Sequence, residues 1–262
     1  MGKRRLDTLL AERGLYQSRS RAAAAVLAGD VRVAGAPARK PGQLVAGDER
    51  LDVAQPAPFV SRGGVKLANA LDGFGLDPAG ARALDVGAST GGFTDCLLQR
   101  GAESVIAVDV AYGELHWKLR NDPRVTVIER RNARTLGPGE LPYRPVLIVV
   151  DVSFISLRKL LGALVACAAE RFDLLALVKP QFEAGREAVG KGGVVRSADE
   201  RREALVAVGR HARDELRADV LGYTPSGLPG PAGNLESFVW MAESGRPGAV
   251  EDLEAAARRA EP

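Results

Sequence analysis

Apolar residues near the start of the chain recur every three or four positions, which is the spacing of one helix face. Leu6, Leu9 and Leu10 follow this spacing up to Gly14, and a second helical stretch begins after Ser18 and ends at Gly29. Runs rich in β-branched residues or leucine then predict strands at 31–33, 43–45 and 50–53, with turns at 34–37 and 46–49. The first part of the chain is therefore predicted to be a small α+β module.

From about residue 80 the pattern changes to apolar runs that alternate with helical segments. A nearly continuous apolar run is typical of a parallel strand whose two faces are covered by helices, so this alternation predicts an α/β doubly wound domain. Five runs fit, at 83–86, 104–108, 125–128, 146–150 and 174–178, and two more at 218–223 and 237–241 predict an antiparallel hairpin at the sheet edge.

Pro56 and Pro58 form a stiff segment between the two patterns and place the domain boundary near residues 54–60. The 262 residues exceed the roughly 100 to 200 that are usual for one domain, so a small and a larger domain are expected. We predict a module at 1–55, a linker at 56–61, an α/β domain at 62–245 and a C-terminal extension at 246–262.

Charge is distributed unevenly between these parts. The net charge is only +3, yet residues 1–40 hold nine Lys or Arg against three Asp or Glu. Such asymmetry predicts a basic module that faces a polyanion. Of the 36 basic residues only seven are lysines, so a lysine that is kept suggests a need that arginine cannot meet, such as losing a proton.

Two cysteines and two histidines cannot build a disulfide framework or a zinc site, so we expect a metal-free protein. The basic N-terminus leads into charged residues where a signal peptide needs an apolar run, and no apolar stretch reaches the roughly 18 residues of a membrane span. The simplest expectation is a cytoplasmic protein with no membrane contact.

A glycine-rich loop follows the first strand of the α/β domain and opens a helix at 96–100. Asp109, about 20 residues further on, lies where a carboxylate commonly binds ribose hydroxyls. The glycine spacing differs from the dinucleotide fingerprint, which favours S-adenosylmethionine over a nicotinamide cofactor, while a plain turn without ligand stays open. Asn132 is a candidate for the adenine edge or an ordinary surface residue. The loop candidates are Asp85, Gly87, Ala88, Ser89, Thr90, Gly91, Gly92 and Phe93.

Two lysines and two carboxylates lie where the chemistry of such a sheet collects, at strand ends. Asp151 and Lys179 directly follow two strands, Glu236 lies just before the last apolar run, and Lys66 lies in the helix that precedes the sheet. Each is also compatible with an ordinary ion pair.

Methyl transfer from a sulfonium to a ribose hydroxyl needs such a set, because the hydroxyl must lose its proton. A lysine whose pKa is lowered to roughly 7 to 8 by burial or a nearby cation can accept that proton, and arginine cannot. Lys66 would supply the cation beside Lys179, while Asp151 and Glu236 would hold the two amines in position.

At this point the chain resembles the TlyA-type ribosomal RNA 2′-O-methyltransferases, historically labelled hemolysins, with an FtsJ-like catalytic domain. The resemblance runs through nearly the whole chain, and its first segments look like an RNA-binding module of a ribosomal protein. The segments that carry it are 5–15, 18–19, 29–31, 40–42, 60–67, 85–95, 151–157, 178–183 and 230–236.

The resemblance implies a Rossmann-like class I methyltransferase sheet with a small N-terminal α+β RNA-binding domain. It also implies a Lys-Asp-Lys-Glu tetrad at Lys66, Asp151, Lys179 and Glu236, and methylation of cytidine ribose in ribosomal RNA within ribosomal subunits. Residues 248–259 fit a short C-terminal helix that some members carry. The linker departs from the family, because it lacks the Trp often found there.

Cations of the first module are the candidates for RNA phosphate contacts, unless they form a solvated basic face. They are Arg4, Arg5, Arg19, Arg21 and Lys40. If the target base must be turned out of a helix, Phe154 or Phe59 is a candidate to stack on it, although residues of this kind more often belong to a core.

Two other function classes stay open from the sequence. One is an RNA-binding or ribosome-assembly factor without catalysis, which would not bind S-adenosylmethionine. The other is a pore-forming cytolysin, for which the chain offers neither a membrane span nor a long amphipathic helix. The nucleotide that is modified and the oligomeric state cannot be predicted from the sequence.

Overall fold

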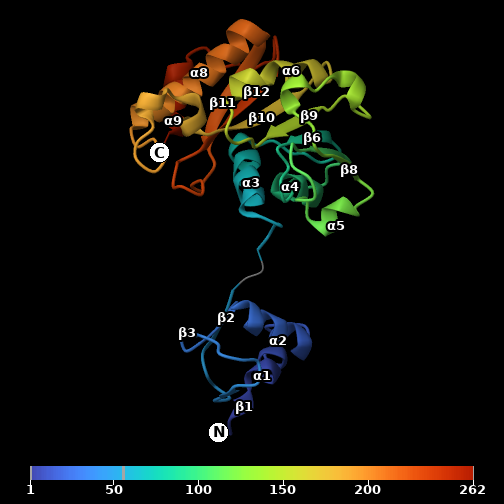
Figure 1. Ribbon diagram of the computed structural model, residues 1–262, viewed down its shortest axis with the longest axis vertical. Coiled ribbons are helices and arrows are strands. Elements are labelled where there is room, and N and C mark those ends of the chain that lie inside the picture. The colour runs from blue at the N-terminus through green and yellow to red at the C-terminus, as the bar shows by residue number, and fades with distance from the viewer. Residues whose placement is uncertain (1, 55–56, 262) are drawn as a thin grey trace. The chain divides into compact units, whose positions relative to one another are not determined.

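The chain forms two compact units, Met1–Ala57 and Pro58–Pro262, in the computed structural model (Figure 1). The structure describes residues 2–54 and 57–261. Met1, Gln55, Pro56 and Pro262, which fall in the predicted module, linker and C-terminal extension, lie outside the described residues.

Two helices build the first unit, α1 (Leu6–Glu12) and α2 (Arg19–Ala28). The Ser18 hydroxyl accepts a hydrogen bond from the Arg21 amide at 3.3 Å, and Gly29 ends α2 in the left-handed conformation (φ 87°). Both predicted helices are confirmed, and their apolar faces pack into one small core.

Short strands complete the first unit: β1 (Arg4–Arg5), β2 (Val31–Val33), β3 (Ala36–Pro37), β4 (Leu44–Val45) and β5 (Leu51–Val53). β1 pairs with β4, and β2 pairs with β3 and β5. The prediction of a turn over all of 34–37 was wrong, because Ala34 and Gly35 have positive φ and form a tight hairpin turn that returns the chain into β3.

A seven-stranded sheet forms the centre of the second unit, with the order β11-β12-β10-β9-β6-β7-β8. The five central and flanking strands from β10 to β8 are parallel, and β12 is antiparallel to both β10 and β11, as the predicted edge hairpin requires. The strands are β6 (Arg82–Val86), β7 (Ser104–Val108), β8 (Val125–Ile128), β9 (Leu147–Val150), β10 (Asp173–Val178), β11 (Ala218–Pro225) and β12 (Ser237–Glu243).

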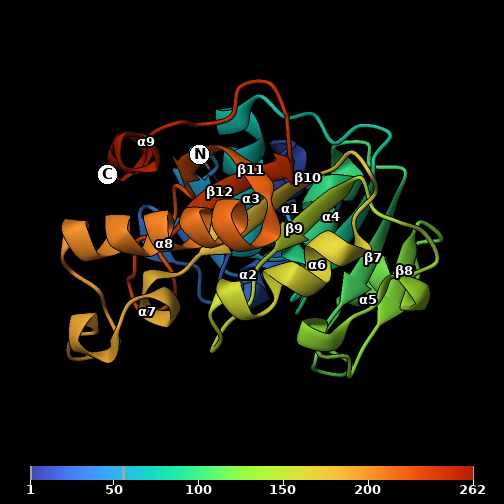
Figure 2. The ribbon, with the colours of Figure 1, turned by 90° about the horizontal axis from the view of Figure 1, so that it is seen from above.

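Helices cover both faces of this sheet, and Figure 2 shows α6 and α8 lying over the strands. One core contains side chains of α6 (Leu161–Cys167), α8 (Ala198–Leu216) and α9 (Leu253–Ala260). The core on the other face contains side chains of α3 (Arg62–Phe74), α4 (Gly92–Gln99) and α5 (Trp117–Arg120). The short helix α7 (Pro180–Glu183) follows β10. The α/β doubly wound prediction is confirmed.

Two predicted helix starts were wrong. α4 begins at Gly92 and not at residue 96, because the left-handed Gly91 (φ 94°) directly precedes its first turn. α9 begins at Leu253 and not at 248, because Gly248 has φ 90° and the Asp252 side chain caps the helix by accepting from the Ala255 amide at 3.0 Å.

The strand order reverses between β6 and β9. From β6 the chain builds outward through β7 to β8, and it then returns to the other side of β6 to place β9 and β10. The carboxyl ends of β6 and β9 are therefore neighbours at a topological switch point, where ligands of open α/β sheets bind.

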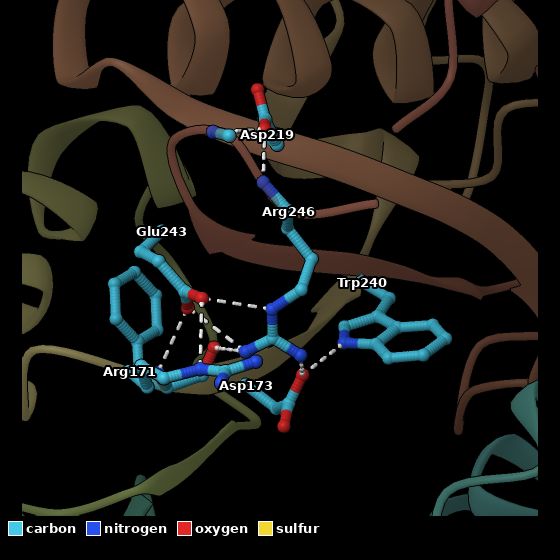
Figure 3. A network of polar contacts seen from close by, with 8 residues as sticks. Arg171, Asp173, Asp219, Trp240, Glu243 and Arg246 are labelled. Atoms are coloured by element: carbon cyan, nitrogen blue, oxygen red, sulfur yellow. Dashed lines mark hydrogen bonds and ion pairs between the residues drawn. The ribbon is translucent and has the colours of Figure 1, made fainter. Parts of the chain in front are cut away.

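The opposite end of β10 and β12 is held by a network centred on Arg246 (Figure 3). The Arg246 guanidinium donates to Glu243 at 2.8 and 2.9 Å and to Asp173 at 3.2 Å, and its backbone amide donates to Asp219. Trp240 Nε1 also donates to Asp173, at 2.9 Å. Because these residues come from β10, β11 and β12 and from the turn after β12, the network fastens the three strands together.

Candidate active site

Two adjoining cavities open at the switch point. We call the first the lysine cavity, with a volume of about 430 Å³, and the second the Asp109 cavity, with a volume of about 450 Å³. Both are lined by Gly87, Ser89, Asp151 and Ser153. Their volumes suit small organic ligands, and their shared wall places a ligand of one next to a ligand of the other.

All four residues of the predicted tetrad line the lysine cavity. Nζ of Lys66 lies 2.5 Å from Oε2 of Glu236, and Nζ of Lys179 lies 2.6 Å from Oδ1 of Asp151. Each carboxylate thus holds one amine. The two pairs differ in burial, because Lys66 and Glu236 are both buried while Asp151 is partly open to the cavity.

The positions of these side chains follow from the elements that carry them. Asp151 and Lys179 directly follow the parallel strands β9 and β10, so both emerge at the same edge of the sheet. Lys66 lies in α3, one turn after its start, and Glu236 immediately precedes the antiparallel strand β12. Gly230 lies so close to the Glu236 carboxylate that a Cβ there would overlap Oε1.

The glycine loop lines both cavities with its backbone. Gly87 has φ 82°, and a Cβ there would overlap the carbonyl oxygen of Asp151, so only glycine lets the two strand ends approach. Ser89 also has a positive φ, of 47°, and its amide donates to Asp109 at 2.7 Å. Ala88, Thr90, Gly92 and Phe93 also line the lysine cavity.

Asp85 and Gly91 line neither cavity. Asp85 is fully buried, and its Oδ2 accepts from the amide and the hydroxyl of Thr94 at 2.9 and 2.6 Å, while Oδ1 has no partner among the described residues. Burial raises the pKa of Asp85 to about 7, helped by the charge of Asp151. A Cβ at Gly91 would overlap Leu119. Asp85 and Gly91 therefore fix the conformation of the loop without lining either cavity.

Asp109 and Asn132 line the Asp109 cavity. Asp109 accepts from the Ser89 amide and, at 2.8 Å, from the Ala111 amide, and each carboxylate oxygen keeps a lone pair for a ligand hydroxyl. The side-chain oxygen Oδ1 of Asn132 accepts a hydrogen bond from the Arg134 amide at 3.0 Å, and no described residue accepts one from Asn132 Nδ2.

Several lining residues were missed by the sequence reasoning. Arg62 donates to the carbonyl of Pro229 at 3.0 Å and lines the lysine cavity, and Ser153 accepts from Lys179 Nζ at 2.8 Å. Glu114 lines the Asp109 cavity and accepts from the Ser89 hydroxyl at 3.1 Å. Arg62 and Ser153 lie inside segments that carry the family resemblance, but neither residue has a spacing signal of its own.

The predicted RNA contacts all lie on the surface of the first unit. Arg5 and Arg19 both pair with the buried Asp7, at 2.7 and 3.1 Å, and the Arg5 guanidinium holds the pKa of that carboxyl well below its usual range. Arg4 pairs with Glu12, and Arg21 donates to Gln17. Lys40 is exposed without an acidic partner among the described residues.

The two family models that match the chain agree with this division. An FtsJ-like methyltransferase model matches residues 59–243, and an S4 domain model matches residues 4–51. The chain belongs to the FtsJ-like methyltransferase family. Its methyl donor is S-adenosylmethionine.

Relatives with known names or solved structures align with this chain over most of its length. "16S/23S rRNA (cytidine-2'-O)-methyltransferase TlyA" of Mycobacterium tuberculosis is 49% identical over 259 residues, which cover 98% of this chain and 96% of the relative. "Hemolysin A" of Brachyspira hyodysenteriae is 38% identical, covering 88% of this chain and 97% of the relative. The solved structure titled "Putative hemolysin from Streptococcus thermophilus" is 37% identical with a TM-score of 0.74, covering 99% and 96% of the two chains. The resemblance to TlyA-type proteins is confirmed.

The residues at the switch point fit this methyl donor on three counts. The glycine loop lets backbone approach a ligand where Gly87 leaves room, Asp109 presents carboxylate lone pairs about 20 residues further on, and the two adjoining cavities have the volume for a nucleoside with an amino-acid tail. Within the described residues, no helix combines the length and the apolar composition that a membrane crossing needs.

Proposed function

We propose that this chain transfers the methyl group of S-adenosylmethionine to the 2′-hydroxyl of a cytidine in ribosomal RNA, and that it meets this RNA within ribosomal subunits. The observation that carries the proposal is the pair of lysine–carboxylate contacts in the lysine cavity, beside the glycine loop. The activity named for the M. tuberculosis relative and the match to an S4 domain support ribosomal RNA as the substrate.

Lys179 is the general base of this proposal. S-adenosylmethionine supplies a methyl group that is activated on a sulfonium. Neutral Lys179 takes the proton of the ribose hydroxyl onto Nζ, the 2′-oxygen forms a bond to the methyl carbon, and the electrons of the breaking carbon–sulfur bond stay on sulfur. Asp151, 2.6 Å from Nζ, holds the amine in place and stabilises the ammonium that results.

Lys66 and Glu236 form the second pair of the mechanism. Glu236 lies 2.5 Å from Lys66 Nζ in a buried position, where the two opposite charges stabilise each other. The positive charge of Lys66 in the same cavity attracts the 2′-oxygen, which becomes negative as it loses its proton.

The cofactor residues divide by their place around the loop. Gly87, Ala88, Ser89 and Thr90 present backbone to the cofactor, with Gly92 and Phe93 closing the same wall. Asp109 would accept hydrogen bonds from the ribose hydroxyls of the cofactor, and Nδ2 of Asn132 would donate a hydrogen bond to its adenine edge. Asp85 and Gly91 do not contact the cofactor in this proposal; they fix the conformation of the loop that does.

The S4 unit positions the RNA through phosphates. Arg5 and Arg19 are oriented by the buried Asp7, which leaves their remaining N–H groups for phosphate oxygens, and Arg4, Arg21 and Lys40 add to the same basic surface. Such contacts carry affinity and register but no base sequence, so binding weakens steeply with salt.

Phe154 is the better of the two candidates for stacking on a base that is turned out of its helix. Its side chain is 91% exposed, its ring lies 5.5 Å from that of Phe182, and it lines the Asp109 cavity. Phe59 instead packs against the core of its own unit, close enough to Gly64 that a Cβ there would overlap it.

Methyl mapping tests this function. Ribosomal subunits that lack the modification are incubated with the full chain and labelled S-adenosylmethionine, and both rRNAs are then mapped for 2′-O-methylation; protein-free rRNA is run in parallel. We expect label on a cytidine ribose, and more of it on subunits than on free RNA. Label on a base, or no label with measurable cofactor binding, would contradict the proposal.

A further inference from the structure

Ser153 lies where the two cavities meet. It follows β9 in the turn that carries Asp151, and it is one of four residues that line both cavities. The next residue, Phe154, has φ 65°, a left-handed conformation that is uncommon outside glycine and that turns the chain sharply. The exposed Ser153 therefore lines both the cavity that contains the two lysines and the cavity that contains Asp109.

The hydroxyl contacts the proposed base. Nζ of Lys179 lies 2.8 Å from Ser153 Oγ and 2.6 Å from Asp151 Oδ1. Asp151 and Ser153 differ in whether they accept or donate hydrogen bonds. A carboxylate only accepts, so it favours the ammonium, whereas a hydroxyl accepts from the ammonium and, after rotating, donates to the lone pair of the neutral amine. Ser153 is thus able to hold the nitrogen in both protonation states.

We propose that Ser153 is a positioning residue for Lys179, an inference that rests on the proposed function. It keeps Nζ in one place while Lys179 passes from the neutral amine, which accepts the proton of the ribose hydroxyl, to the ammonium. The proton moves from the 2′-oxygen to Nζ, and Ser153 exchanges the direction of one hydrogen bond without a net gain or loss of protons.

Loss of this hydroxyl has a particular signature. Lys179 pairs with Asp151 and Ser153 at the end of β9, and the other charged groups lining its cavity are Arg62 and Lys66 from α3 and Glu236 ahead of β12. Without the hydroxyl the ammonium loses a charge-assisted hydrogen bond and the amine only a neutral one, so the ammonium is destabilised more. The rate of methyl transfer falls in acid where the base becomes protonated, so this acidic limb of the pH–rate profile moves to lower pH in the variant.

The experiment measures single-turnover methyl transfer to unmodified ribosomal subunits between pH 6 and 9.5, using full-length wild type, Ser153→Ala, Ser153→Thr and Ser244→Ala. Ser244 is an exposed serine at the far end of β12 and serves as the matched control. For Ser153→Ala we expect a plateau about tenfold to a hundredfold lower and an acidic limb shifted down by about one pH unit. Ser153→Thr and Ser244→Ala keep the wild-type limb, and cofactor affinity by calorimetry stays the same in all four proteins.

Each failure has its own reading. A wild type that methylates no rRNA overturns the proposed function and this inference with it. An active wild type whose profile Ser153→Ala reproduces overturns the role of Ser153 alone. The role of Ser153 is also overturned if Ser153→Ala lowers the plateau rate and the Tm but leaves the acidic limb of the pH profile unchanged, because that is the result of a merely structural serine. It is overturned as well if Ser153→Thr behaves like Ser153→Ala.

Discussion

The two ends of the β10–β12 pair carry opposite kinds of charge chemistry. At the end where Val178 faces Ser237, the basic residues of the proposed mechanism are two lysines, Lys179 and Lys66, each paired with one carboxylate. At the other end, where Asp173 faces Ala242, the centre is Arg246, which donates to two carboxylates and a backbone carbonyl (Figure 3).

This difference matches what the two side chains do. A guanidinium stays protonated at every physiological pH and binds carboxylates through a rigid fork, which suits a permanent fastening. An ammonium is a point charge that is able to lose its proton. In a chain with 36 basic residues and only seven lysines, Lys66 and Lys179 lie at the end where the proposed reaction moves a proton. Arg246 lies at the end where strands only have to be held.

The largest effect on stability is expected at the site end. Glu236→Ala leaves Lys66 buried without its partner, and breaking a buried pair on one side costs about 3–5 kcal/mol. Urea unfolding followed by tryptophan fluorescence measures it, because both tryptophans, Trp117 and Trp240, lie in the second unit. The control Glu254→Ala removes an exposed pair with Arg210 and should cost at most about 1 kcal/mol. An equal loss of unfolding free energy in the two variants would contradict the stronger contribution expected of the buried Lys66–Glu236 pair.

A smaller effect concerns pH at the same end. The pKa of Asp85 is raised to about 7 in the folded chain by burial, against 3.8 as the ordinary value, so the folded state holds a proton that the unfolded state has lost. Its contribution to stability is present below pH 4 and disappears as the pH rises through 7, by about 3 kcal/mol between pH 5 and 8. Asp85→Asn should remove this decline, and the exposed control Asp214→Asn should not. Parallel curves for wild type and Asp85→Asn would contradict the assignment.

The smallest effect has the opposite sign at the other end. Hydrogen bonds from Arg246 lower the pKa of Glu243 to about 2, so its contribution to stability is present above 4.5 and fades as the pH falls toward 2. Glu243→Gln should cost about 1–2 kcal/mol at pH 6, and its gap to wild type should narrow between pH 5 and pH 3. The matched control is the exposed Glu251→Gln. A gap that widens in acid would show that Glu243 is not held as a carboxylate.

Much of the fold was predictable because the parallel strands are unbroken apolar runs. Among the parallel strands, β7 and β8 lie at their predicted bounds, and β6, β9 and β10 differ by one residue. The antiparallel strand β2 of the first unit also lies at its predicted bounds. The strands that were missed, β1 and β3, are two-residue edge strands whose sequences, Arg4–Arg5 and Ala36–Pro37, have no apolar alternation to read. Their pairing comes from tertiary contacts.

The sequence identified most residues that line the lysine cavity, but not which of them contact one another. Position at strand ends singled out Asp151 and Lys179, but no local pattern says that Lys66 meets Glu236 across 170 residues, since that contact depends on the antiparallel placement of β12. Asp85 looked like a ligand contact because it precedes the loop, yet strand alternation turns its side chain into the interior, onto Thr94. Ser153 became visible only when the Lys179 amine had been placed beside it.

The central claim is that Lys179 is a lysine because it must give up its proton, and Lys179→Arg tests it most directly. Arginine keeps the positive charge and is able to pair with Asp151, so cofactor binding measured by calorimetry should persist while single-turnover methyl transfer to ribosomal subunits falls by at least about a hundredfold. Arg246→Lys, measured beside it, should keep the transfer rate and lose only stability. A Lys179→Arg enzyme that transfers methyl groups at nearly the wild-type rate would contradict the account.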